Sequence, residues 1–194
     1  MTDPRTSQAF LQLKVTMLGV SPAVWRRIVV PGSIVLPDLH VVLQKAFGWT
    51  DSHLHAFEQG RKCFQPFNPD LELGRDPGCV SDEARVVLSE LLYRKGDELD
   101  YQYDFGDFWE HAIVVEEVLS GASSDPVRCL AGARSAPPED CGGVSGYAGL
   151  LEALADPDHP EHDDLSEWAG EDFDPEAFDL KAVNRALAKL KRRK

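Results

Sequence analysis

Two runs of strand-forming residues flank Gly106-Asp107 between Asp100 and Val115, and this stretch constrains the fold more than any other. A Gly-Asp pair between strands is typical of a two-residue hairpin turn, because Gly readily adopts the positive φ that a type II′ turn requires at its first position. The sequence therefore predicts an antiparallel hairpin in which Phe105 faces Phe108. That pairing fixes the register of every residue in both strands.

This register predicts which side chains share a face of the hairpin. Successive side chains of a strand point to opposite faces. One face is expected to carry Gln102, Asp104, Trp109 and His111, and the other Tyr101, Tyr103, Phe105 and Phe108. Asp104 and His111 then become diagonal neighbours on adjacent strands, at a separation that a small ion can bridge.

The first half of the chain shows both strand and helix periodicity. Alternating apolar residues predict strands over 11–17, 24–30 and 53–58, with 62–67 as the hairpin partner of the third. His53, His55 and Phe57 are expected to share one face of the strand 53–58. Helical spacing predicts a helix over 37–47, with Pro37 in its first turn and Gly48 after its end.

The second half is expected to become helical toward its C-terminus. A short helix over 87–92 and a strand over 127–132 come first, and 68–83 and 137–146 have the Gly and Pro content of loops. Helical spacing returns in 147–155 and 180–191, on either side of an acidic segment, 156–176, without Lys or Arg. These elements predict an α+β fold, in which helices pack on a mainly antiparallel sheet.

The charge of the chain limits the partners that it is expected to bind. Its formal net charge is −13 at pH 7 and its pI is about 4.8. Direct nucleic-acid binding is not expected, because it requires a basic face, whereas an acidic surface favours cations or a basic protein partner. The sequence has neither an apolar run of the roughly 20 residues that a membrane helix needs nor a secretory signal, so we expect a cytoplasmic protein.

Several familiar site types are disfavoured by the spacing of their residues. The four cysteines form no Cys-x-x-Cys pair, which favours reduced, partly buried thiols over a four-cysteine zinc site. Asp104-Phe-Gly106 matches the magnesium-binding triplet of protein kinases, but the accompanying catalytic motifs are absent from the sequence. Ser145 lacks the Gly-x-Ser-x-Gly spacing of a hydrolase nucleophile. No catalytic nucleophile and no organic cofactor site are therefore predicted.

Carboxylates and imidazoles near the hairpin form the strongest candidate site. The candidate metal ligands are Asp104, Asp107 and His111 from the hairpin, His53 or His55 from the strand 53–58, and Glu139 or Asp140 from the Pro-Pro-Glu-Asp loop. Such a mixed set of nitrogen and oxygen donors suits a divalent metal, Zn²⁺ or Mn²⁺, that could activate a water molecule. A structural role is the alternative, since Asp107 can stabilise the turn, Asp104 can accept local hydrogen bonds, and His111 can be a hydrogen-bonded, half-buried histidine.

An ordered set of short motifs resembles one known family. The motifs are Trp25-Arg26, Phe47-Gly-Trp49, His53-Leu-His-Ala-Phe57, Tyr103-Asp-Phe-Gly-Asp-Phe-Trp-Glu-His111, and Pro137-Pro-Glu-Asp-Cys-Gly-Gly143 with Gly146-Tyr147. The chain resembles the plasmid pRiA4b ORF-3-like family, whose members also travel with insertion elements. The resemblance implies an α+β fold for a single domain over 10–194, helical from about residue 147, after a loose N-terminus over 1–9.

The resemblance implies an association with plasmids or mobile elements but no defined activity. Our leading hypothesis is therefore a binding or interaction module. The alternative is a metal-dependent hydrolase, acting on a phosphoester, in which Asp104, His111 and Glu139 or Asp140 hold the ion and His55 is a base. A third hypothesis, a toxin or antitoxin type partner that masks a basic protein, rests on the acidity alone.

Overall fold

The computed structural model describes residues 9–66, 80–120, 127–170 and 172–190. Its strands are β1 (Phe10–Met17), β2 (Trp25–Pro31), β3 (His55–Gln59), β4 (Lys62–Gln65), β5 (Val80–Asp82), β6 (Glu98–Tyr103), β7 (Trp109–Leu119) and β8 (Arg128–Ala133). Its helices are α1 (Leu36–Phe47), the 3₁₀ turn η2 (Glu83–Arg85), α2 (Leu88–Leu91), α3 (Gly143–Ala155), α4 (His162–Ala169) and α5 (Leu180–Leu187).

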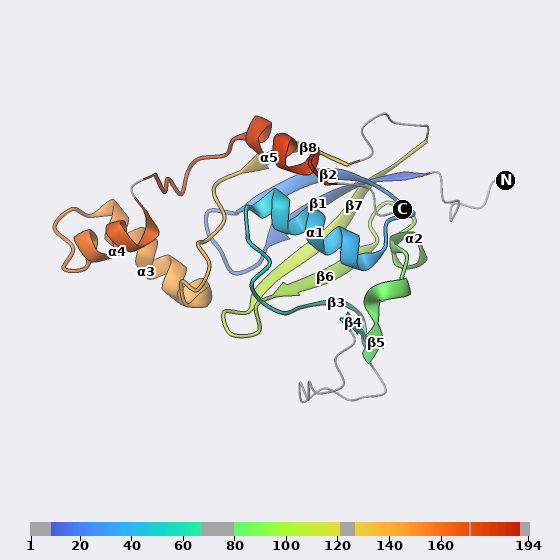
Figure 1. Ribbon diagram of the computed structural model, residues 1–194, viewed down its shortest axis with the longest axis horizontal. Helices are drawn as coiled ribbons and strands as arrows, with labels where there is room; N and C mark the ends of the chain where they lie inside the picture. The colour runs from blue at the N-terminus through green and yellow to red at the C-terminus, as the bar shows by residue number, and fades with distance from the viewer. Residues whose placement is uncertain (1–8, 67–79, 121–126, 171, 191–194) are drawn as a thin grey trace.

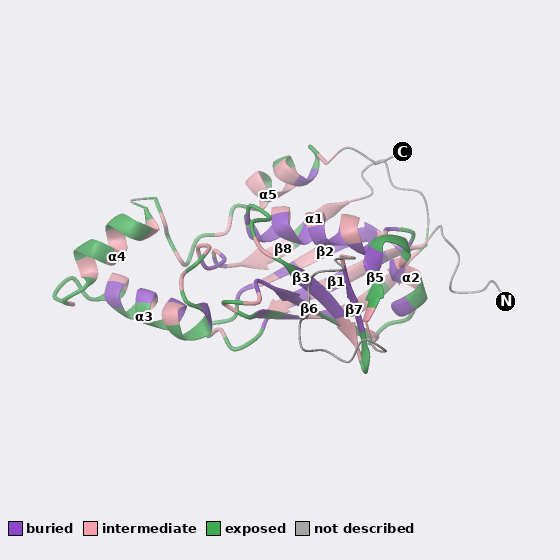
Figure 2. Ribbon diagram, turned by 60° about the horizontal axis from the view of Figure 1, so that its bottom comes forward, coloured by how far each residue is buried: buried purple, intermediate pink, exposed green. Residues whose placement is uncertain are grey.

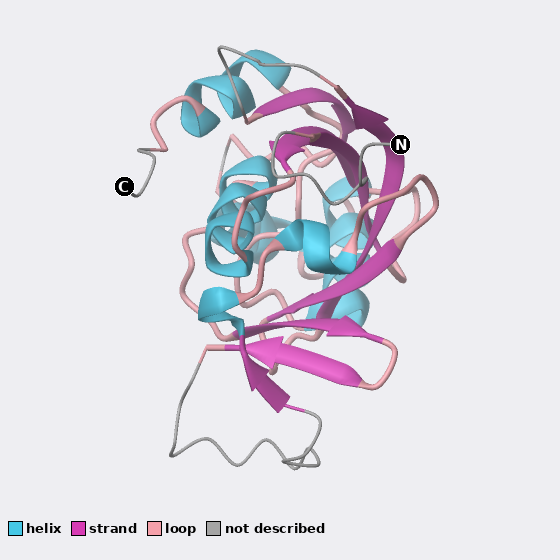
Figure 3. Cartoon of the chain, turned by 90° about the vertical axis from the view of Figure 1, so that its right-hand side faces the viewer, coloured by secondary structure: helices cyan, strands magenta, loops and turns pink. Residues whose placement is uncertain are grey.

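The strands form one sheet in the order β5-β4-β3-β6-β7-β1-β2-β8. Every neighbouring pair is antiparallel except β4 and β5. Figure 3 shows the sheet curving around the helices, which gather on its concave side. The predicted α+β fold, with helices on a mainly antiparallel sheet and a helical C-terminal part, is confirmed.

The strand pair at the N-terminus forms as its alternating pattern predicts. Leu11, Leu13, Val15 and Met17 of β1 are buried, and the residues between them are half-buried. β1 pairs with β2 on one side and with β7 on the other, so it lies inside the sheet. Burial on one face of an interior strand is what a period of two residues produces.

Helix α1 covers the face of the sheet on which the site is built. Pro37 lies in its first turn and Gly48, at φ 87°, ends it in the left-handed conformation, as the sequence predicts. Its buried face presents polar as well as apolar side chains to the sheet. The hydroxyl of Tyr101 in β6 accepts a hydrogen bond of 3.2 Å from Nε2 of Gln44 and lies 2.8 Å from Nδ1 of His40.

The central hairpin has a longer turn than predicted, and its register is shifted by one residue. Tyr103 pairs with Trp109 and Tyr101 pairs with His111, so residues 104–108 form the connection. Asp104 and Phe108 adopt left-handed φ angles of 58° and 57°, and the amide of Phe108 donates to the carbonyl oxygen of Asp104. The expected pairings of Phe105 with Phe108 and of Asp104 with Trp109 are therefore wrong.

The shift changes which side chains share a face. Tyr101, Tyr103, Trp109 and His111 all point to the buried face, each with at most 1% of its surface exposed. Phe108, expected to lie with the tyrosines, is 57% exposed in the turn. Because Asp104 now belongs to the turn, it is no longer a cross-strand neighbour of His111.

The C-terminal elements differ from their predicted limits. Helix α3 begins at Gly143 rather than at Tyr147, so part of the expected loop 137–146 is helical. The acidic segment contains α4, which has no buried residue and projects with α3 beyond one end of the sheet (Figures 1 and 2). Helix α5 packs on α1 and β8, and Asn184 bonds to both backbone groups of Cys129.

Among the described residues, most of the buried apolar side chains form one cluster that extends from Leu11 in β1 to Leu187 in α5. The predicted loose N-terminus and most of the loop 68–83 lie outside the described residues. Within the described ranges, no helix has both the length and the apolar character needed to cross a membrane.

Candidate metal centre

His53 is the central side chain of the candidate site. It lies in the segment between α1 and β3, two residues before the strand begins, and not on the strand as predicted. The carbonyl oxygen of the next residue, Leu54, accepts a hydrogen bond of 2.9 Å from the amide of Asp104. This bond ties the β6–β7 turn to the segment that carries His53, and so brings the imidazole beside Asp104.

Asp104 begins the β6–β7 turn and is held there by its own hydrogen bonds. Its Oδ1 accepts from the amide of Gly106 at 2.8 Å, as the structural alternative expected of an Asp near a turn. Its Oδ2 lies 3.7 Å from Nδ1 of His53. The carboxylate is 8% exposed, so one oxygen stabilises the turn while the other faces the imidazole.

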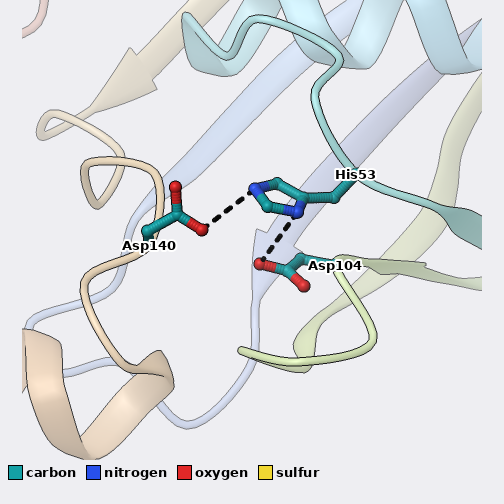
Figure 4. Close-up of side chains that lie close together, drawn as sticks. All are labelled: His53, Asp104 and Asp140. Carbon is teal, nitrogen blue, oxygen red and sulfur yellow. Dashed lines mark ion pairs between the residues drawn. The ribbon is translucent and has the colours of Figure 1, made fainter.

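Asp140 approaches the other ring nitrogen of His53 from the Pro-Pro-Glu-Asp loop (Figure 4). Its Oδ1 lies 3.2 Å from Nε2 of His53, and its side chain is 74% exposed. The loop is fixed at Pro137, whose carbonyl oxygen accepts from the indole nitrogen of Trp49 at 2.9 Å. Asp140 adopts a left-handed φ of 58°, which Asp tolerates better than most residues.

Glu139 lies beside His53 and also accepts hydrogen bonds from neighbouring residues. Its Oε1 accepts hydrogen bonds from the Tyr103 hydroxyl and from the amide of Thr50, each at 3.0 Å. Its Oε2 lies 3.8 Å from Nε2 of His53. Burial, with a further contribution from Glu139, raises the pKa of Tyr103, so the phenol stays protonated and donates to the carboxylate.

His53, Asp104 and Asp140 together meet the basic requirement of a metal site. One ligand atom from each residue lies within 4.8 Å of the other two. Metal bonds of about 2.0–2.2 Å at tetrahedral angles place donor atoms roughly 3.3–3.5 Å apart. Asp140 is already near this distance from Nε2 of His53, whereas Asp104 faces Nδ1 and would have to move toward Nε2 to share the same ion. Nε2 of His53 is buried and makes no hydrogen bond, despite its distance of 3.2 Å from Asp140.

Asp107 and His111 do not join this group. Oδ2 of Asp107 accepts from the amide of Gly142 at 3.1 Å, which links the β6–β7 turn to the start of α3. His111 is completely buried among the rings of Phe47, Trp49 and Tyr101. Its Nδ1 donates to the backbone oxygen of Trp109 at 3.1 Å, and burial lowers its pKa to about 4. The shifted register of the hairpin places His111 in the core and away from the cluster.

His55 belongs to a different buried network. Its Nε2 lies 3.1 Å from both carboxylate oxygens of Glu83, and its ring stacks on His40 with centroids 3.5 Å apart. His40 contacts the Tyr101 hydroxyl and Oδ1 of Asp51, at 2.8 and 2.7 Å. Burial, and next the neighbouring His55, lower the pKa of His40 to about 4. The two imidazoles thus bridge α1 to β3 and η2.

The sequence did not reveal this second network. His40 occupies the buried face of α1 among Leu39, Val42 and Leu43. This position in the helical pattern is the only feature of the sequence that indicates burial of His40. Asp51 lies in a segment for which no element is predicted, and Glu83 is the last residue of the predicted loop 68–83. Only the packing of α1 on the sheet brings these residues together.

The other histidines and the cysteines form no metal group in the parts of the chain that the structure describes. Nδ1 of His162 donates to the carbonyl oxygen of Ala153 at 2.7 Å, and Nδ1 of His159 accepts from the amide of Glu161. No disulfide joins Cys63, Cys129 and Cys141 to one another, and Cys79 lies outside the described residues.

Comparison with known proteins places the chain in a family. The sequence model described as "Plasmid pRiA4b ORF-3-like protein" matches residues 9–182. The uncharacterized protein y4hQ of Sinorhizobium fredii (strain NBRC 101917 / NGR234) is 41% identical over 182 residues, which cover 93% of this chain and 91% of that protein. The crystal structure of MM3350, a protein of unknown function from Methanosarcina mazei Go1, is similar with a TM-score of 0.80 and 36% identity, over 91% of this chain and 98% of that chain. The chain therefore belongs to the plasmid pRiA4b ORF-3-like family.

Proposed function

We propose that the chain binds one divalent cation, Zn²⁺ or Mn²⁺, through His53, Asp104 and Asp140. The observation that carries this proposal is the buried Nε2 of His53, which makes no hydrogen bond although it faces the Asp140 carboxylate at 3.2 Å. A buried polar atom without a partner costs free energy. A metal ion bound to this nitrogen would supply the missing partner, with Asp140 already beside it. Asp104, which faces Nδ1, would move toward the ion to become the third ligand.

The charge around His53 supports a cation. Three carboxylates, from Asp104, Glu139 and Asp140, lie within 4 Å of the imidazole. In the described parts of the chain, no Lys or Arg forms an ion pair with any of them. The group therefore carries more negative charge than one imidazole can balance, and a divalent ion would relieve the repulsion.

The backbone of the site supports a functional role as well. Left-handed conformations at Asp104, Phe108 and Asp140 occur in the two loops that form the site. For a bulky residue such as Phe108 this conformation is a true outlier. Strained residues of this kind collect at binding and catalytic sites, where the surrounding structure holds them in place.

Hydrolysis of a phosphoester is a second candidate function, favoured by the exposure of Asp140. Its side chain is 74% exposed, so an ion held here would remain open to solvent on one side. Three protein ligands with a water in the fourth position are typical of catalytic zinc, which lowers the pKa of that water and creates a hydroxide nucleophile. His53, Asp104 and Asp140 would hold the ion, which would supply an activated water for the phosphorus atom, and the ester oxygen would take up a proton and leave as the alcohol.

The decisive experiment is elemental analysis of tag-free protein purified without chelator, beside a matched sample treated with EDTA. We expect about one zinc or manganese per chain, lost with EDTA and restored by the metal alone. His53→Gln and Asp140→Asn should each reduce the metal content, since Asn tolerates the left-handed backbone at position 140. Metal-free wild-type protein that also fails to bind added Zn²⁺ or Mn²⁺ in calorimetry would refute the proposal.

Screening for hydrolysis follows only if the metal binds. Turnover of a generic phosphodiester such as bis(4-nitrophenyl) phosphate by metal-loaded protein, absent in His53→Gln, would support the second candidate. The interaction module and the basic protein partner remain predictions, because none of the contacts described above bears on them.

A further inference from the structure

A cavity of about 490 Å³ opens beside the candidate metal centre, between α1, α5 and the loop that carries Glu139. Most of its lining is apolar and comes from Phe47, Trp49, Pro137, Phe173, Phe178 and Val183. Its volume falls within the range of small-molecule sites, about 300–1,000 Å³. The charged residues among its walls decide which molecules it suits.

Arg26 is the buried charge of this cavity. It is 3% exposed, and it lines the cavity from β2. Its Nε donates to the carbonyl oxygen of Ala46 at 2.8 Å, and its Nη1 donates to those of Trp25 and Ala133 at 2.8 and 2.9 Å. Nη2 makes no hydrogen bond to the described residues, so this edge of the guanidinium is available to a ligand.

Two aromatic rings pack against the guanidinium. Its central carbon lies 5.0 Å from the ring centroid of Phe47 and 4.6 Å from that of Phe178. In the described parts of the chain no carboxylate forms an ion pair with Arg26, and burial lowers its pKa to about 10. Buried charges are normally paired, so Arg26 is a cation without its counter-ion.

The other charged residues of the cavity wall are Lys45, Glu139 and Asp179. Glu139 already accepts from Tyr103 and Thr50, and Asp179 accepts from the amide of Ala182 at 2.9 Å at the start of α5. Lys45, the second cation on the wall, has no carboxylate partner among the described residues either. Both carboxylates of the wall therefore have partners, and Asp179 also pairs with Arg185 at 3.6 Å, whereas neither Arg26 nor Lys45 has a carboxylate partner among the described residues.

We propose that this cavity binds a small organic anion, a carboxylate on an apolar or aromatic body, with the carboxylate on Nη2 of Arg26. The apolar body would contact Trp49, Phe173 and Val183, while the anion would neutralise the buried guanidinium. Arginine suits this role because its planar donors match the geometry of a carboxylate. Binding of the organic anion does not require the metal. Glu139 nevertheless belongs to both sites, because it lines the cavity and also lies beside His53.

The test compares 2-naphthoate with its neutral amide, 2-naphthamide, by calorimetry on EDTA-treated protein. These probes have the same rings and differ in charge. Wild-type protein should bind the acid at least about tenfold more tightly than the amide, which is the usual contribution of a charge-assisted hydrogen bond. Equal affinities, or binding of neither probe, would overturn the proposal.

Two sets of variants locate the binding. Arg26→Gln should remove the preference for the acid and change the affinity for the amide by less than about threefold. Ala182→Trp fills the cavity from α5 and should abolish binding of both probes, whereas Ala188→Trp, on the exposed side of the end of α5, should leave both affinities unchanged.

If Arg26→Gln fails to fold, the wild-type preference and the Ala182→Trp result decide the question. Tight binding of 2-naphthoate that survives Ala182→Trp would place the probe outside the cavity and refute the inference. Because metal-free protein is used, failure here leaves the proposed metal centre untouched, and failure of the metal centre leaves this test unaffected.

Discussion

Tyr101 lies directly opposite His111 in the ladder between β6 and β7, and its carbonyl oxygen accepts a hydrogen bond of 3.3 Å from Nδ1 of the imidazole. The proton of the neutral ring is therefore on Nδ1. Nε2 is left buried without a partner. A second proton would create a charge in the core, near the guanidinium of Arg26, and this is why the pKa of His111 is low.

The buried His111 predicts a loss of stability in mild acid. Its pKa is lowered from 6.5 to about 4 in the folded chain, so between these values the unfolded chain binds the proton and the folded chain does not. The free energy of unfolding should fall as the pH decreases from about 6.5 to 4, by on the order of 3 kcal/mol for this group. Urea unfolding across this pH range measures the slope.

His111→Phe should flatten this acid limb, because the titrating group is gone. Trp109→Phe, a change without a titrating group on the same face of β7, should keep it. An unchanged slope in His111→Phe would show that other groups, such as His40, produce the whole effect.

Asp104 and Asp107 should respond differently to the same substitution. Asp104→Asn removes a charged metal ligand but keeps a side chain that accepts from Gly106 and tolerates the left-handed backbone, so metal content should drop by about tenfold or more with little change in Tm. Asp107→Asn can still accept from Gly142 and should retain the metal. Elemental analysis of both proteins, with Tm measured with and without EDTA, separates the roles. A lower Tm for Asp104→Asn, equal with and without chelator, would indicate a purely structural carboxylate.

Gly143 controls how closely the two loops of the site approach each other. It has a φ of 68°, and a Cβ there would lie 2.5 Å from the carbonyl oxygen of Asp107. Gly143→Ala should therefore push the Asp140 loop away from the β6–β7 turn and weaken metal binding by about tenfold, although Gly143 is not a ligand. Ser145→Ala, at an exposed position in the first turn of α3, is the control. Calorimetry with Zn²⁺ gives the affinities, and an unaltered affinity in Gly143→Ala would contradict this role.

Gly132 should be intolerant of even a methyl group. A Cβ at this position of β8 would lie 2.5 Å from Cζ of Phe178 and 2.9 Å from the carbonyl oxygen of Trp25. Gly132→Ala must therefore displace the ring that covers Arg26, at a cost of about 1–3 kcal/mol in the free energy of unfolding. Gly149→Ala, in α3 with open space around it, should instead stabilise the chain by about 0.5–1 kcal/mol. Denaturant unfolding of both variants would reveal the contrast, and equal shifts would rule out the overpacking argument.

Local sequence patterns sufficed for the elements whose burial is regular. The alternation in β1 and the helical spacing from Pro37 to Gly48 both arise from one buried face, and a buried face leaves a period in the sequence. The central hairpin was placed correctly but in the wrong register. Nothing in the sequence assigns a left-handed conformation to Phe108, and without it Gly106-Asp107 is interpreted as a two-residue turn.

The candidate site could be predicted only as a set of possible ligands. His53, Asp104 and Asp140 were all in that set, but the choice among them depends on contacts between segments far apart in the chain. His53 lies in the segment before β3 and faces the carboxylates. His55 is the first residue of β3 and contacts Glu83 instead. Arg26 gave no sign of being an unpaired charge, since its role depends on Phe178 and on the cavity beneath α5.

The position of β1 inside the sheet has a consequence for synthesis on the ribosome. β2 follows β1 closely and can pair with it as soon as both have emerged, but β7, its other neighbour, belongs to the opposite half of the chain. Until β7 arrives, one edge of β1 has unpaired backbone groups next to a row of apolar side chains, and such edges promote aggregation. A nascent chain stalled or truncated before residue 109 should therefore need a chaperone, whereas one released after β7 can complete the middle of its sheet.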